Sequence, residues 1–140
     1  MRGPRLSSLP EWALELVDTT PVAHLGLLDE DGHPRVQPIT FVRVGDELWS
    51  AIDDKPKRTT PARIKRLQRD PRATITVDRY DDDWSRLAWV QAIGTMRVLD
   101  VRDDILGALK KRYPVYEDLS PKGPLLCLEP SLVIWWRAKG

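Results

Sequence analysis

Short runs in which apolar and polar residues alternate predict most of the secondary structure of this chain. Such alternation is typical of strands with one buried face. The expected strands cover residues 22–28, 36–44, 47–52, 73–77, 87–99, 125–128 and 132–136. Turn sequences at 29–32 and 45–46 separate the first three, which we therefore expect to form an antiparallel meander. Pro38 removes a backbone donor and places its strand at a sheet edge or a bulge.

Three segments carry the wider apolar spacing that is typical of helices. They cover residues 10–17, 61–69 and 101–113. Thr60 would cap the second helix and Pro61 would begin it. The order of strands and helices favours a mainly β fold, a closed antiparallel barrel with helices at its rim, over a doubly wound sheet. We expect one domain over residues 1–140, with an N-terminal helical segment at 1–20 and the barrel at 21–137.

Composition excludes several functional classes. The chain has 140 residues and a formal net charge of +1, so any attraction for an anion must be local. One cysteine, Cys127, and two histidines, His24 and His33, make a disulfide and a structural zinc site unexpected. Cys127 lies in an apolar run and is expected to be a buried thiol. With no secretory pattern and no apolar run of about 20 residues, we expect a cytoplasmic protein that does not contact membranes.

The stretch 55–69 holds seven Lys and Arg residues and no acid. Its first part is a polar loop that leads into the predicted helix, where unpaired backbone N–H groups and the helix dipole favour a phosphate. We therefore expect Lys57 and Arg58 to bind an anion. Lys65, Arg66 and Arg69 are expected on the solvated face of the helix. Nucleic-acid binding is disfavoured, because this helix holds no aromatic residue.

The order of several segments resembles a known family. These segments are 34–41, 48–53, 55–60, 67–73 and 90–99. Together they resemble the pyridoxamine 5′-phosphate oxidase-like split barrels. The runs at 54–59 and 78–84 are most similar to the actinobacterial branch that uses the deazaflavin coenzyme F420 in place of FMN. The resemblance implies an antiparallel split β-barrel of the FMN-binding type, and a homodimer with two cofactor sites between its subunits.

The resemblance also implies which residues bind the cofactor. Those on the two strands next to the cofactor ring are Gln37, Pro38, Ile39, Thr40, Phe41, Ser50 and Ala51. Lys57 and Arg58 match the basic pair that holds the cofactor phosphate. Trp89 stands where FMN oxidases often carry Gln, which favours F420. The arginine and histidine that bind substrate in pyridoxamine phosphate oxidases have no clear match here, so vitamin B6 oxidation is not expected.

The implied activity is hydride transfer between reduced deazaflavin and a small-molecule acceptor, with the cofactor supplying the chemistry. The alternatives are an FMN-dependent oxidoreductase of the same fold and a non-catalytic F420 or flavin carrier or sensor. No catalytic residue is assigned, because no acid–base pair or activated nucleophile is visible. The acidic run at 81–83 is typical of a solvated turn. The remaining candidates either line an acceptor pocket or lie in the core or the dimer interface: Trp84, Trp89, Trp135 and Trp136.

Overall fold

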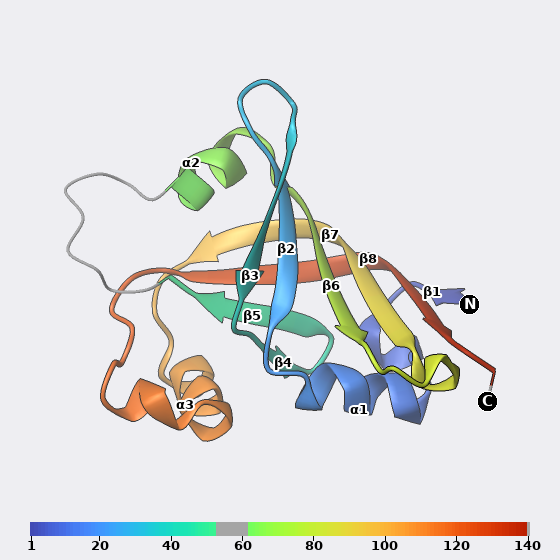
Figure 1. The fold of residues 1–140 in the computed structure, drawn as a ribbon. Coiled ribbons are helices and arrows are strands. Elements are labelled where there is room, and N and C mark those ends of the chain that lie inside the picture. The colour runs from blue at the N-terminus through green and yellow to red at the C-terminus, as the bar shows by residue number, and fades with distance from the viewer. Residues whose placement is uncertain (53–61, 140) are drawn as a thin grey trace.

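The computed structural model describes residues 1–52 and 62–139, whose strands form one antiparallel sheet that curls into a half-barrel (Figure 1). The strands are β1 (Arg2–Gly3), β2 (Ala23–Leu28), β3 (Pro34–Ile39), β4 (Val42–Val44), β5 (Glu47–Ala51), β6 (Arg72–Arg79), β7 (Ala88–Leu99) and β8 (Leu125–Arg137). The helices are α1 (Glu11–Thr19), α2 (Ala62–Arg69) and α3 (Asp103–Arg112), with short 3₁₀ turns at Leu6–Ser8, Trp84–Arg86 and Pro114–Glu117. The predicted mainly β fold with helices at its rim is confirmed.

The strand order is β3-β2-β6-β7-β8-β5-β4, and β1 adds to β8 beside this path. The two strands at the ends of this order, β3 and β4, are consecutive in the chain. Only Thr40 and Phe41 lie between them, so the chain passes from one edge of the sheet to the other across two residues. Pro38 lies on β3 at that edge, as its missing backbone donor requires.

The two hairpins of the predicted meander are present, as β2 with β3 and β4 with β5, but the continuous middle strand is wrong. The expected strand at 36–44 breaks at Thr40 and Phe41 into β3 and β4, and these two belong to opposite edges of the sheet. As a result β5 pairs with β4 and β8, not with β3; Trp49, for example, lies opposite Cys127.

The two strands expected at 125–128 and 132–136 are one strand, β8. Its register with β7 shifts between Ile93 and Gly94, so that Ile93 lies opposite Leu132 and Gly94 opposite Pro130. Ser131 is the extra residue of this β-bulge. The bulge explains the interruption in the apolar pattern, because an inserted residue reverses the alternation of faces along a strand.

The core lies between the inner face of the sheet and helices α1 and α2. Leu25, Ile75 and Val90 point inward from β2, β6 and β7 and are almost completely buried. They share one cluster with residues of both helices: Leu16 and Val17 of α1, and Ile64 and Leu67 of α2. On α1, Val17 is buried, whereas Trp12 and Leu14 are partly buried and pack at the margin of the cluster.

A second apolar cluster attaches α3 to the sheet. Ile105 and Leu109 of α3 pack there with Trp49 of β5, Leu125 of β8 and Tyr116 of the 3₁₀ turn that follows α3. This contact places the C-terminal end of α3 next to the corner between β3 and β4. Within the described part of the chain, no helix has both the length and the apolar character needed to cross a membrane.

The bulge between β7 and β8 leads to a prediction about Gly94. A Cβ at this position would clash with the Glu129 carbonyl oxygen and lie 2.9 Å from Pro130 Cα, both backbone atoms that cannot rotate away. We expect Gly94→Ala to lower the free energy of unfolding by about 1–3 kcal/mol, as overpacking does. Urea denaturation at a fixed protein concentration measures this change.

Gly107 of α3 provides the matched control. A Cβ there would meet no described atom within 4 Å, so Gly107→Ala should raise stability by about 0.5–1 kcal/mol through the helix propensity of alanine. An unchanged urea midpoint for Gly94→Ala would show that the bulge can open without cost.

Candidate functional site

A pocket of about 240 Å³ opens where the ends of β3 and β5 meet the first turn of α2. We call it the corner pocket, because it lies beside the Thr40–Phe41 corner. It is lined by Val22, Pro38, Ile39, Thr40, Ser50, Ala51, Arg63 and Tyr116. Five of these residues are among those that the sequence assigns to cofactor binding: Pro38, Ile39, Thr40, Ser50 and Ala51.

Hydroxyl groups fix the wall of the corner pocket around Thr40. Ser50 is almost completely buried, and its Oγ donates a hydrogen bond of 2.7 Å to the Thr40 carbonyl oxygen. The Thr40 Oγ1 lies 2.6 Å from the hydroxyl oxygen of Tyr116, which is also buried. These bonds join the Thr40–Phe41 corner to β5 and to the turn after α3. The position of Thr40 is therefore determined by one partner ten positions away and by another 76 positions away.

Arg63 supplies the positive charge of the corner pocket. It lies in the first turn of α2, which has no acidic residue. The preceding segment, 53–61, joins β5 to α2, and Lys57 and Arg58 lie there, outside the described residues. Ala51 and Arg63, which lie two positions before and two positions after this segment, both line the pocket.

Three predicted site residues have other positions. Gln37 is half-buried on β3 and does not line the corner pocket. The side chain of Phe41 is completely buried in the core. Trp89 lies on β7 opposite Asp78 and Trp136 and is not part of the corner pocket of its own chain. The role of Phe41 is therefore to anchor the corner, and its neighbour Thr40 faces the pocket.

The other tryptophans also differ in their surroundings. Trp135 is 7% exposed and belongs to the core, so it does not line an acceptor pocket. Trp84 and Trp136 are 69% and 44% exposed. Trp136 lies beside Trp89 on the outer side of β7 and β8.

Sequence reasoning missed Tyr116 as a pocket residue. It follows α3 in a 3₁₀ turn and lies 76 positions from Thr40, so no local pattern indicates the contact. Arg63 belongs to the basic stretch at 55–69, but the sequence does not distinguish it from the other basic residues of α2. In the structure Arg63 lines the corner pocket, whereas Arg69 lies 3.9 Å from the Glu30 carboxylate, at the β2–β3 hairpin.

The face of the sheet opposite the core contains a larger hollow of about 690 Å³. Its lining includes Val36, Thr74, Thr76, Gln91 and Ile93, from strands β3, β6 and β7. We call this side the outer sheet face. Most of these side chains are uncharged, and Val36 is 68% exposed.

Two sequence hypotheses about reactive groups are resolved. Cys127 is a buried thiol, as predicted, and burial raises its pKa to about 12, so it is protonated at neutral pH. In the acidic turn, Asp81 accepts a bond from the Asp83 backbone, and Asp83 accepts bonds from Ser85. These carboxylates stabilise the turn.

The described residues include no group of three or more His, Cys, Asp or Glu placed to hold a metal ion.

Comparison with known proteins agrees with this geometry. A curled antiparallel sheet with its edges joined at a corner, and with helices at its rim, defines the split-barrel class. The chain belongs to the pyridoxamine 5′-phosphate oxidase family, whose sequence profile matches residues 9–135. No curated protein matches the sequence significantly.

Solved structures share this fold at low sequence identity. A conserved hypothetical protein of Mycobacterium tuberculosis superposes with a TM-score of 0.76 at 16% identity, over 92% of this chain and 85% of that one. An FAD-binding protein of Mesorhizobium loti gives 0.67 at 18% identity, over 89% and 92%. A heme storage protein of Vibrio cholerae gives 0.68 at 15% identity, over 89% and 93%. The same fold thus occurs in proteins described as binding different cofactors.

Proposed function

We propose that this chain binds coenzyme F420 at the corner pocket and transfers hydride between the reduced cofactor and a small organic acceptor. The observation that carries the proposal is that residues of β3 and β5, chosen from the sequence alone, line one pocket together with Arg63. Family membership supports a redox cofactor, and the FAD-binding relative supports one of the flavin type.

The chemistry of the corner pocket fits such a cofactor. Val22, Ile39 and Ala51 offer apolar surface to a planar ring. The Thr40 hydroxyl lies at the same wall, and Arg63 gives a positive charge for a phosphate or carboxylate group. When bound, the cofactor supplies the hydride chemistry, and the chain orients it and excludes water.

FMN is the second candidate cofactor. The FAD-binding relative favours it, because FAD and FMN carry the same isoalloxazine ring. A non-catalytic carrier or sensor is a further alternative. It is favoured by the pocket lining, since none of the described residues there is a carboxylate or a histidine that would act as a general acid or base.

We also propose that two copies of the chain pair through the outer sheet face. A pocket of about 240 Å³ is smaller than the roughly 300–1,000 Å³ of typical ligand sites, so it holds only part of the cofactor. The outer sheet face is largely uncharged and carries Val36, Trp89 and Trp136. A two-fold contact would cover this face in both copies and let the partner complete each site.

The cofactor assignment is tested by titrating the purified protein with F420 and with FMN while intrinsic tryptophan fluorescence is followed. We expect tighter binding of F420. Equal or tighter binding of FMN would favour the second candidate, and binding of neither would refute the proposed function.

The phosphate assignment is tested by Lys57→Ala and Arg58→Ala. Each variant should lose a charge-assisted bond to the cofactor, worth about 1.5–3 kcal/mol, and bind it roughly 10- to 150-fold more weakly in the same titration. The far-UV circular dichroism spectrum should not change. The control is Arg69→Ala, because Arg69 lies near Glu30 and outside the corner pocket; its effect should stay within about 0.5 kcal/mol. An equal loss in the control would indicate a diffuse electrostatic attraction.

The proposed dimer is tested by sedimentation velocity at micromolar concentration. The wild-type chain should sediment as a dimer. Val36→Glu would place a charge in the outer sheet face and should shift the protein toward monomer. A monomeric wild-type protein that still binds cofactor would contradict the proposed arrangement.

A further inference from the structure

The C-terminal end of α3 is tied to two segments that border the corner pocket. One is the link between α1 and β2, which ends at the pocket residue Val22, and the other is the Thr40–Phe41 corner. Arg112 and Tyr113 make all of these ties. Neither residue lines the pocket itself.

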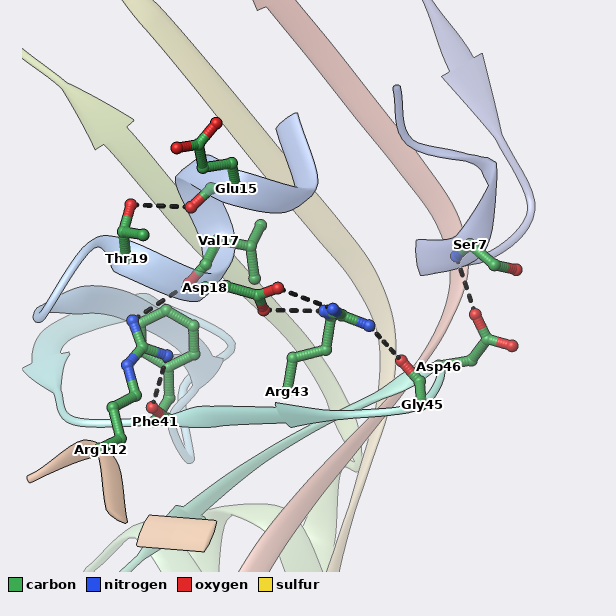
Figure 2. Close-up of polar contacts among 10 residues, drawn as sticks. All are labelled: Ser7, Glu15, Val17, Asp18, Thr19, Phe41, Arg43, Gly45, Asp46 and Arg112. Atoms are coloured by element: carbon green, nitrogen blue, oxygen red, sulfur yellow. Dashed lines mark hydrogen bonds and ion pairs between the residues drawn. The ribbon is translucent and has the colours of Figure 1, made fainter. Parts of the chain in front are cut away.

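Arg112 donates hydrogen bonds to three backbone carbonyl oxygens. The acceptors are those of Phe41 at 2.9 Å, Val17 at 3.1 Å and Thr20. Figure 2 shows the guanidinium of Arg112 between Val17 and Phe41, and the central guanidinium carbon lies 4.3 Å from the centre of the Phe41 ring. Carbonyls at a helix C-terminus lack partners within the helix and carry the negative end of its dipole, so this cation stabilises the end of α1.

Tyr113 ties the same two segments together. Its hydroxyl donates a bond of 2.7 Å to the Pro21 carbonyl oxygen and accepts one of 3.2 Å from the Phe41 N–H group. Pro21 and Phe41 are neighbours in sequence of Val22 and Thr40. Arg112 and Tyr113 thus hold the two backbone segments that carry the pocket residues Val22 and Thr40.

A second arginine, Arg43, also bonds to the end of α1 but not to the Thr40–Phe41 corner. Arg43 of β4 forms a two-pronged ion pair with Asp18 of α1, at 2.9 and 2.7 Å, and also bonds to the Gly45 carbonyl (Figure 2). Both arginines connect the end of α1 to the sheet. Only Arg112 bonds to the corner.

We infer that Arg112 is a positioning residue for the corner pocket: with Tyr113, it sets the separation of the Val22 and Thr40 walls and thereby the affinity for the cofactor. The half-buried position of Arg112 beside three carbonyl groups suits this role. A guanidinium bonded to three fixed acceptors and stacked on a ring has one favoured position, which the flexible ammonium of lysine does not share. The part of the inference that concerns affinity rests on the proposed function, whereas the part that concerns the corner does not.

The experiment compares Arg112→Met and Arg112→Lys with the control Arg43→Met. Backbone hydrogen exchange is first measured by NMR on each protein without cofactor. In Arg112→Met, the amide of Phe41 should exchange about tenfold faster or more, because the bonds that hold the corner are weakened. Arg112→Lys should lie between this variant and the wild type. Arg43→Met should leave the Phe41 amide unchanged.

The affinities for F420 and FMN are then measured by tryptophan fluorescence, at a temperature where urea denaturation shows each variant to be folded. Arg112→Met should bind the preferred cofactor about tenfold more weakly or worse, and Arg43→Met should match the wild type. If Arg112→Met does not fold, Arg112→Lys carries the comparison.

Unchanged exchange and affinity in the Arg112 variants would overturn the inference, as would equal losses in Arg43→Met, which would indicate general loosening of α1. If the wild type binds neither cofactor, the proposed function fails. The exchange of the Phe41 amide still decides whether Arg112 positions the corner.

Discussion

The structure depends on how the chain crosses from one edge of the half-barrel to the other at Thr40 and Phe41. A strand pairs its backbone groups with a neighbouring strand, but residues that leave one edge and enter the other lose these partners. Here the missing partners are supplied by side chains. The Thr40 carbonyl accepts from Ser50, and the backbone of Phe41 is bonded by Tyr113 and Arg112. At the corner, the two carbonyl groups and the Phe41 N–H group are thus all bonded by side chains, and the candidate site lies against this piece of backbone.

The parts of the fold that the sequence predicts correctly rest on local signals. Alternation identifies β2, β6 and β7, amphipathic spacing identifies the three helices, and Pro38 identifies an edge. The parts that it predicts wrongly depend on distant partners. The break at Thr40 and Phe41 and the continuity of β8 through its bulge follow from closure of the sheet and from pairing with β7, which single-strand patterns do not encode.

The residues of the candidate site also fall into those that the sequence indicates and those that only the folded structure brings there. Resemblance to a family located Thr40, Ser50 and Ala51, because these positions are fixed by strand order and strand length. It assigned Phe41 to the cofactor side, although the ring of this residue belongs to the core. Tyr116 had no sequence signal, since its contact with Thr40 exists only after α3 has packed on β5 and β8.

These long connections determine when the site can form during folding. Apart from the Ser50–Thr40 bond, which spans ten positions, the side-chain bonds that hold the corner join residues 71 to 76 positions apart, and the tie to Pro21 spans 92. Contacts of such separation form late, because the entropy of closing a long loop must be overcome first. A chain emerging from the ribosome therefore lacks the complete lining of the corner pocket until α3 and the turn after it have been synthesised. A ligand that binds the corner pocket would therefore stabilise the folded chain over forms that lack α3 and the turn after it.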